Sequence, residues 1–357
     1  MRQLTLRRGF SFAALAAAAV LASCATPEPE APPAPPPPPP PPPVTLNESV
    51  ADAASIYVTF MRDVATIQAG GFTSAEAIQE ALRKGATYEP NQLSRGMIAY
   101  ASILALQSPE FVAGVRAFAA DPVQRREIVG RIIADPAYAA TFPGADSAAG
   151  LIAATIGKEV GVLGELAEAV EGDAYTIQER RDPRRRWAIQ ANANRAARLE
   201  GAKDLSDNPM LPSAEESARL LAAAHAGNGL GLEANRISAP YTPAVANALA
   251  IAALAALGAA GDDARINTDA LVSEPGAEFC LNMSKLMLFQ CLAAARPAYE
   301  DMFCLGRHVV RDLATCASQG TRIATSSVSA PVVTDTTLTQ TPVAVEVPVA
   351  ATTPPQS

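Results

Sequence analysis

Residue types that could carry chemistry are few in this chain. It has five cysteines and two histidines, His225 and His308, and it contains no His-Glu-x-x-His, Gly-x-Ser-x-Gly or Ser-x-x-Lys motif and no phosphate-binding loop. With so little imidazole, general base catalysis would fall to carboxylates, and the 36 Asp and Glu residues form no distinctive pair along the sequence. The sequence therefore favours a non-enzymatic role without a cofactor.

Four cysteines follow one another late in the chain, and their spacing admits two kinds of chemistry. They are Cys280, Cys291, Cys304 and Cys316. Cys304 and His308 are four residues apart and could ligate zinc from one helix turn if two of the other cysteines joined them. The export signal described below leads to an oxidising compartment, where such cysteines form disulfides. We therefore expect two disulfides and no metal.

The segments around these cysteines predict which of them pair. Residues 278–294 and 298–316 both have the pattern of helices, and Arg296-Pro297 separates them. Proline interrupts a helix, so we expect a break there, and a link this short makes the two helices antiparallel neighbours. In an antiparallel hairpin, the position numbers of facing residues have a nearly constant sum. Only nested pairs keep that sum constant to within one residue, and these are Cys280–Cys316 and Cys291–Cys304.

Helix geometry excludes sequential pairing and adds an expectation. Sequential pairs would join cysteines 11 or 12 residues apart along one helix, about 16–18 Å, whereas a disulfide needs Cα atoms within about 7 Å. Eleven residues return to the same helix face, but the 12 residues from Cys304 to Cys316 overshoot it by about 120°. We therefore expect a distortion of the helix near Gly306.

A basic cluster is the second feature that could carry function. It consists of Arg180, Arg181, Arg184, Arg185, Arg186 and Trp187. It could contact an anionic envelope polymer or the acidic surface of a partner, with the tryptophan as an interface anchor. The favoured alternative is a solvated helical face balanced by Glu179 and Asp182, with the tryptophan packed inward. The cluster is nevertheless the first choice for a partner site.

The first 23 residues have the three parts of an export signal. Arg2, Arg7 and Arg8 are followed by an apolar run, Phe10 to Ala22, and then by small residues. The run is about 13 residues long, which is too short for a helix that spans a bilayer. We therefore expect residues 1–23 to be a cleaved signal peptide.

The end of this signal is Leu21-Ala22-Ser23-Cys24, which resembles the lipobox of bacterial lipoprotein precursors. The resemblance covers about the first 25 residues. It implies that diacylglycerol is attached to the Cys24 thiol, that the peptidase cuts before this cysteine, and that the protein is tethered to membrane lipid. Ala25 is not the aspartate associated with retention at the inner membrane, so the resemblance implies the outer membrane. An ordinary secretory signal with a chance cysteine is the alternative.

Charge limits the partners. The formal net charge is -8, and removal of the leader takes away three arginines and no acid. An acidic chain repels phosphate backbones and anionic head groups, so it excludes nucleic acid as a partner and requires a covalent anchor for membrane attachment. An envelope protein or a cell-wall polymer remains as the expected partner.

Non-globular segments flank the apolar part of the chain. Residues 24–43 end in an unbroken proline run from Pro35 to Pro43, which predicts a polyproline II spacer with a rise of about 3.1 Å per residue. The spacer could reach across the periplasm or could be a simple tether. Residues 318–357 are rich in Ser, Thr, Val and Pro and predict a disordered tail.

The residues between these segments predict an all-α fold, a multi-helix bundle of short and medium helices that ends in the disulfide-linked hairpin. Alanine supplies much of the 49% hydrophobic content, and aromatic residues are only 5%. A polar stretch at 203–212 divides the bundle into an N-terminal region, 44–202, and a C-terminal region, 203–317.

Capping residues place several of the helices. Asn47 and Ser74 open segments that end at Gly70-Gly71 and Gly85, and Ser213 opens a helix that ends at Gly227. Three short helices begin where a capping side chain precedes proline, at Ser108, Asp121 and Asp135. Stacked short helices could form a binding groove, but the favoured interpretation is that they fill one side of the core.

Two apolar segments predict interior helices. One begins at Asp146 and runs to about Val170, and its glycines predict close approach of neighbouring backbone. The other runs from Thr242 to Ala260 and is nearly long enough to span a membrane, but its alanine content favours the centre of a bundle.

Together these features predict a lipid-anchored helical protein with a non-enzymatic partner-binding or scaffolding role at the periplasmic face of the outer membrane. The alternative is a cell-wall-acting enzyme or enzyme accessory that uses carboxylate chemistry. A cleft with two carboxyl groups about 5–9.5 Å apart would favour the enzyme, and a groove without such a pair would favour the binding role.

Overall fold

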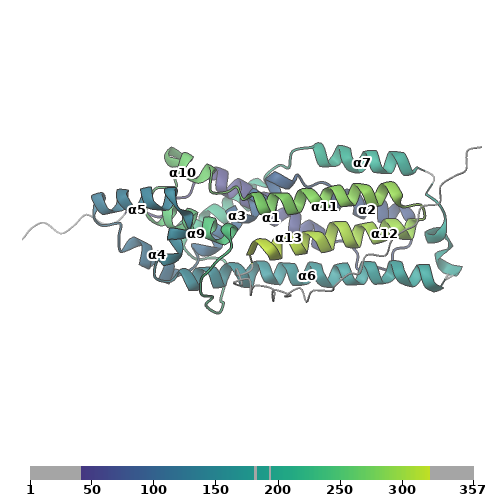
Figure 1. The fold of residues 1–357 in the computed structure, drawn as a ribbon, viewed down its shortest axis with the longest axis horizontal. Coiled ribbons are helices and arrows are strands. Elements are labelled where there is room, and N and C mark those ends of the chain that lie inside the picture. The colour runs from purple at the N-terminus through teal and green to yellow at the C-terminus, as the bar shows by residue number, and fades with distance from the viewer. Residues whose placement is uncertain (1–41, 181–182, 193, 322–357) are drawn as a thin grey trace, which may run out of the picture. The chain divides into compact units, whose positions relative to one another are not determined.

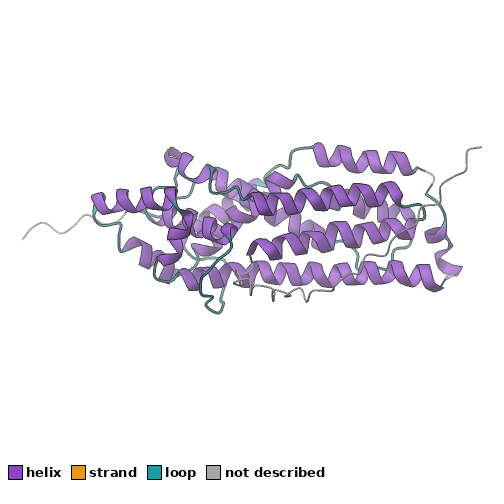
Figure 2. Ribbon diagram, in the orientation of Figure 1, coloured by secondary structure: helices purple, strands orange, loops and turns teal. Residues whose placement is uncertain are grey.

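The computed structural model describes residues 42–180, 183–192 and 194–321. Every regular element in these residues is a helix (Figure 2), so the all-α prediction is confirmed. The described residues belong to one compact unit. Cys24, the proline run up to residue 41 and most of the predicted tail lie outside them.

The helices follow one another with short connections (Figure 1). Their bounds are α1 (Glu48–Ala65), α2 (Ala75–Ala86), α3 (Pro90–Ala105), α4 (Pro109–Arg116), α5 (Pro122–Ala134), η1 (Pro136–Thr141), α6 (Ala145–Arg180), η2 (Pro183–Ile189), α7 (Arg195–Asp207), α8 (Ala214–Ala226), α9 (Pro243–Ala256), η3 (Asp262–Ala264), α10 (Ile266–Asp269), α11 (Pro275–Ala294), α12 (Ala298–Leu305), η4 (Gly306–Arg311) and α13 (Asp312–Thr321).

The core is built on α1, α3 and α9. Helix α3 packs against both of the others, and nearly all of α9 is buried. The alanines of α9 let neighbouring helices approach closely, and its core position agrees with the bundle interpretation. Helix α6 is the one helix of the described residues whose length and apolarity would suffice for a membrane span, and only 39% of its most apolar window is buried.

The predicted caps are present at the amino ends of the helices. The side chain of Asn47 accepts from the Val50 amide, and Ser74 and Ser213 cap α2 and α8 in the same way. Ser108, Asp121 and Asp135 each accept a backbone N–H, so the three short helices begin where the sequence places them. These helices pack against α9, as expected if they fill one side of the core.

Helix lengths and some glycine roles differ from expectation. Helix α6 continues ten residues past Val170 to Arg180. A Cβ on Gly150 would lie 2.0 Å from the Asn235 carbonyl oxygen, so backbone does approach there. A Cβ on Gly157, Gly161 or Gly164 would meet nothing within 4 Å, so close approach was the wrong expectation for these three, whose face of α6 is open.

Two further boundaries differ from the sequence-based expectation. Helix α2 includes Gly85, because a Cβ there would lie 2.4 Å from Val309 Cγ1 and glycine allows this close packing. Helix α13 continues past residue 318 to Thr321, where Gly320 and Thr321 are buried. The polar stretch at 203–212 separates no two cores, because α8 and α9 pack directly on α1 and α3.

The cysteine hairpin forms as predicted. Helix α11 lies alongside α12 and α13 (Figure 1), and disulfides join Cys280 to Cys316 and Cys291 to Cys304 with Cα–Cα distances of 5.6 and 5.7 Å. The expected distortion is the π-helix η4, which starts at Gly306. A π turn holds an extra residue, so the 12 residues from Cys304 rotate about as far as 11 residues of α-helix and bring Cys316 back to the facing side.

Candidate functional site

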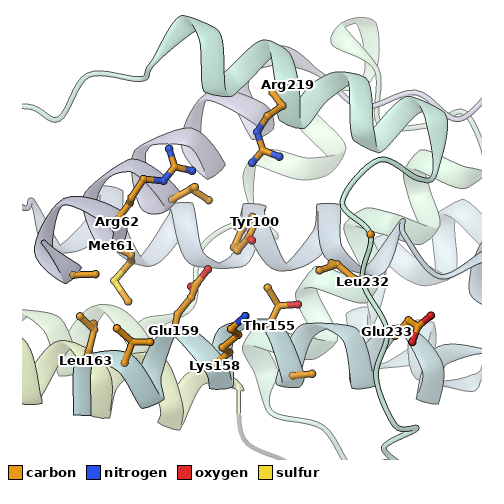
Figure 3. A pocket seen from close by; sticks show the side chains of 15 residues that line it. Met61, Arg62, Tyr100, Thr155, Lys158, Glu159, Leu163, Arg219, Leu232 and Glu233 are labelled. Atoms are coloured by element: carbon orange, nitrogen blue, oxygen red, sulfur yellow. The ribbon is translucent and has the colours of Figure 1, made fainter. Parts of the chain in front are cut away.

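A cleft of about 550 Å³ opens between α1, α3, α6 and α8, and the loop that follows α8 closes one side (Figure 3). Its volume lies in the range of about 300–1,000 Å³ that is typical of small-molecule sites. Four other cavities in the described residues have volumes of about 10 to 300 Å³ and are smaller. The cleft is therefore the first place to look for function.

One face of α6 forms the floor. Thr155, Lys158, Glu159 and Val162 recur at the spacing of three and four residues that places side chains on the same face of a helix. Val162 is 46% exposed, so an apolar side chain faces the open volume. The face combines a carboxyl group, an ammonium group and apolar surface.

The loop wall is fixed by contacts with α4 and α6. The backbone of Asn235 passes over Gly150, where no side chain could fit, and the Ile237 amide donates to the Asp146 carbonyl at 3.0 Å. Arg236 bridges Glu110, at 2.6 Å, and Asp146, at 3.3 Å. These contacts hold the preceding residues of the loop, which line the cleft with Leu232 and Glu233.

Tyr100 of α3 lines the back of the cleft, and Tyr57 of α1 is buried next to it. A Cβ on Gly96 of α3 would lie 2.5 Å from the Ala53 carbonyl oxygen, so glycine lets α1 and α3 cross closely. At this crossing the rings of Tyr57 and Tyr100 lie 5.8 Å apart, centroid to centroid. The Tyr57 hydroxyl lies 3.4 Å from Oε2 of Glu159. Tyr57 thus links this close helix crossing to the carboxyl group of the cleft.

The Glu159 carboxyl group titrates near neutral pH. Burial raises the pKa of Glu159 to about 7, although the hydrogen bond from Tyr57 and the charge of Arg62 act in the opposite direction. Burial and the neighbouring Glu159 raise the pKa of Tyr57 well above 10, so this hydroxyl stays protonated and acts as the donor. Glu159 can therefore hold or release a proton at physiological pH.

Two arginines stand at the rim opposite α6 (Figure 3). Arg219 of α8 forms an ion pair with Glu216 one turn earlier, and Arg62 of α1 lies 3.5 Å from the same carboxylate. Burial tends to raise the pKa of Glu216, but the hydrogen bond and charge of Arg219, with those of Arg62, outweigh it and lower the value. Glu216 therefore stays ionised and holds both guanidinium groups in place. Two cations share one carboxylate, which leaves a positive charge at this end of the cleft.

The carboxyl groups that line the cleft do not form a pair. Glu159 lies on the floor beneath the arginines, whereas Glu233 lies on the loop beyond Leu232 and points away from it (Figure 3). Glu216 is engaged with the arginines of the rim. The arrangement suits recognition of a ligand better than hydrolysis by two opposed carboxyl groups.

The basic cluster predicted as a partner contact lies elsewhere, at the carboxyl end of α6 and in η2. Arg180, Arg184 and Arg186 are exposed, Arg185 forms an ion pair with Asp173, and Trp187 is half-buried against the core. Arg181 lies outside the described residues, as does Asp182, one of the two acids expected to balance the cluster. None of the described residues of the cluster lines the cleft.

The remaining candidates have structural partners. Cys304 is joined to Cys291 and cannot serve as a zinc thiolate, while His308 Nδ1 lies 3.1 Å from Asp312. The Leu46 amide donates to Nε2 of His225 at 3.2 Å. Among the described residues no group of three or more His, Cys, Asp or Glu side chains is placed to hold a metal ion.

Sequence reasoning missed the cleft. The available signal was the adjacent charges of Lys158 and Glu159 within a glycine- and alanine-rich helix. Such charges indicate that this part of the helix does not face the apolar core. Arg62 and Arg219 give no such signal, because each lies on an ordinary amphipathic helix. No protein-family model matches this chain, and comparison with curated proteins and with solved structures gives no match either.

Proposed function

We propose that this protein is a lipid-anchored helical protein of the bacterial envelope, with a non-enzymatic binding or scaffolding role at the periplasmic face of the outer membrane. The acylated Cys24 holds it to the membrane, and the proline run carries the helical domain away from the lipid. The cleft between α1, α3, α6 and α8 is the place where it binds its ligand or partner.

One observation carries the binding role: the cleft places apolar side chains below two arginines that Glu216 holds at its rim. Val162 and Leu232 offer apolar contact, while Arg62 and Arg219 are 60% and 47% exposed at the rim. Apolar walls with a few fixed polar groups are the usual composition of a ligand site. The cleft could also bind an envelope protein or a cell-wall polymer, provided that the partner has a segment narrow enough to enter the cleft.

Photo-crosslinking in the native envelope tests where binding occurs. A photoreactive amino acid at Val162, in the cleft, is compared with one at Tyr175, which lies on the same helix and is 50% exposed but outside the cleft. We expect a defined adduct from position 162 and none from position 175, read by mass spectrometry. Equal labelling from both positions, or from neither, contradicts binding in the cleft.

The anchor is tested separately by Cys24→Ser. The variant should lose acylation and either leave the membrane fraction or remain uncleaved. Two or three acyl chains anchor a protein stably, at roughly 0.8 kcal/mol for each buried methylene. A mature wild-type protein that begins at Cys24 or Ala25 and carries no lipid mass would disprove the anchor and leave the cleft unaffected.

A carboxylate enzyme remains a second candidate because of Glu159. A carboxyl group with a pKa of about 7 in a cleft has the property required of a general acid. If the protein cleaves a cell-wall polymer, Glu159→Gln should abolish product release, measured by chromatography of digested peptidoglycan. The binding role predicts no product from wild type or variant.

A further inference from the structure

We infer that the cleft binds a small amphiphile that has one anionic head group, a carboxylate or a phosphate, and an apolar body. The head lies against Arg62 and Arg219, and the body lies along Met61, Val162 and Leu163. This inference rests on the proposed function, because it names the ligand of the same cleft.

The arginines have more donors than their shared partner can use. Two guanidinium groups carry about ten N–H donors, whereas one carboxylate offers about four acceptor positions. Arg219 meets Glu216 through Nε at 3.3 Å and through Nη2, and Arg62 meets it through one nitrogen at 3.5 Å. Both arginine side chains are about half exposed and both line the cleft, so a second anion can reach them there. A carboxylate or a phosphate can accept from the N–H donors that Glu216 leaves unused.

The apolar body is indicated by the walls below the arginines. Val58 and Met61 of α1 face Val162 and Leu163 of α6 across the cleft, and Figure 3 shows Met61 and Leu163 on the same side of Glu159. Burial of apolar surface stabilises a complex by about 25 cal/mol per Å². Of these four residues, Val162 is the one with a large exposed fraction and so with surface left to bury. Charge at the rim and apolar surface beneath it match the two ends of an amphiphile.

The charges around Glu159 add a pH dependence. The titratable and charged groups that line the cleft with it are Arg62 of α1, Tyr100 of α3, Lys158 of α6, Arg219 of α8 and Glu233 of the loop. Tyr57 and Glu216 lie behind this lining, where Tyr57 contacts Glu159 and Glu216 contacts the two arginines. Below about pH 7 Glu159 is protonated and adds no negative charge to the site. Above it the ionised carboxylate repels an anionic head. Binding of a carboxylate head, whose own charge does not change in this range, should therefore weaken as the pH rises from 6 to 8.

Calorimetric titration with matched probes tests the inference. The sample is the chain from residue 24 onward with Cys24→Ser and both disulfides intact. Because this variant carries no lipid, it needs no detergent. The probes are decanoate, decyl phosphate, decanol and inorganic phosphate. We expect one or both anionic amphiphiles to bind at least ten-fold more tightly than decanol and than inorganic phosphate. The tighter of the two identifies the head as a carboxylate, as in a fatty acid, or as a phosphate, as in a phospholipid fragment.

Variants locate the site. Arg62→Gln with Arg219→Gln should weaken the anionic probes at least ten-fold, and Val162→Asp, a change at an exposed position, should do the same without disturbing the fold. Arg265→Gln is the matched control, because Arg265 is 59% exposed and ion-paired but lies away from the cleft. Melting curves of every variant confirm that it is folded.

The outcomes separate this inference from the function beneath it. If neither decanoate nor decyl phosphate binds more tightly than decanol, or if affinity is unchanged in both cleft variants, the anionic amphiphile is overturned. If position 162 still gives a crosslinked adduct in the envelope, the cleft binds a macromolecule and the proposed function stands. If neither crosslinking nor calorimetry reports binding, both fail.

Discussion

Two parts of this bundle bury polar side chains, and they treat them differently. In the cleft, Glu159 has a single hydroxyl partner, Tyr57, and faces open volume. Where α2, α7 and α12 meet, Asp301 is fully buried and its Oδ2 accepts from Arg198, Asn192 and Gln79. Asp301 Oδ1 and Arg198 Nε have no partner among the described residues, yet both side chains remain locked in the ion pair.

Lys285, like Asp301, is a buried polar side chain enclosed by protein. Its ammonium group donates to the carbonyl oxygens of Ala86 and Tyr88, both at 2.7 Å, and to the Ser206 hydroxyl at 3.0 Å, and it lies 3.6 Å from the centre of the Tyr88 ring. Burial lowers the pKa of Lys285 to about 7, but three acceptors match the three donors of the charged form. The contrast teaches that polar groups closed in by protein hold helices together, whereas those beside open volume are available to a ligand.

Breaking the buried pair should have the largest effect. Arg198→Ala leaves Asp301 buried without its cation, and such a loss costs about 3–5 kcal/mol of unfolding free energy. Urea denaturation at pH 7.5 measures it. Arg265→Ala, which removes an exposed pair with Asp269, is the control and should cost less than about 1 kcal/mol. A loss below 1 kcal/mol for Arg198→Ala would remove the distinction between the two regions.

Removal of the buried ammonium group should have an intermediate effect. Lys285→Met keeps the apolar length of the side chain but leaves the Ala86 and Tyr88 carbonyl oxygens without their donor, at about 1–3 kcal/mol. Lys84→Met at an exposed position is the matched control and should change the melting temperature little. Equal melting temperatures for the two variants would show that Lys285 contributes no more than a surface lysine.

Glu159 should affect stability through pH. An unfolded glutamate loses its proton near pH 4.5 and Glu159 in the fold near pH 7, so the native state binds more protons between these values. Stability therefore falls as the pH rises through this window. Glu159→Gln should remove this fall. The difference in unfolding free energy between variant and wild type, measured by urea denaturation, should therefore shift in favour of the variant by on the order of 1 kcal/mol from pH 4.5 to pH 8, after allowance for solvent screening. Burial also raises the pKa of Asp301, to about 6, with the same sign, but this contribution is common to both proteins.

Arg62→Gln should have the smallest effect on stability. Arg62 forms an ion pair as Arg198 does, but its side chain is 60% exposed and that of Arg198 only 5%. Solvent screens the exposed pair, so we expect a change within about 0.5 kcal/mol in the urea assay. A loss comparable with that of Arg198→Ala would make the rim of the cleft a structural element and not a recognition surface.

The same contrast explains what the sequence could predict. Caps such as Ser108 and Asp121, and the cysteine hairpin, depend on residues close together in the chain, so spacing alone locates them. The cleft unites positions 62, 159 and 219, which only the packing of distant helices brings together. Helix α3 escaped notice because its cap is Glu89, which is not among the favoured capping residues, and because its buried residues cover most of its circumference.

The π segment from Gly306 to Arg311 makes the hairpin tolerant of a change in length at one place. It holds one residue more than the α-helical register between the flanking cysteines requires. A deletion of one residue there would leave an 11-residue interval, which returns to the same face as the interval between Cys280 and Cys291 in α11. The same deletion within α11 would turn one cysteine about 100° away from its partner. The two arms of this hairpin therefore differ in their tolerance of deletions. Both disulfides can still form after a one-residue deletion in η4, but not after one in α11.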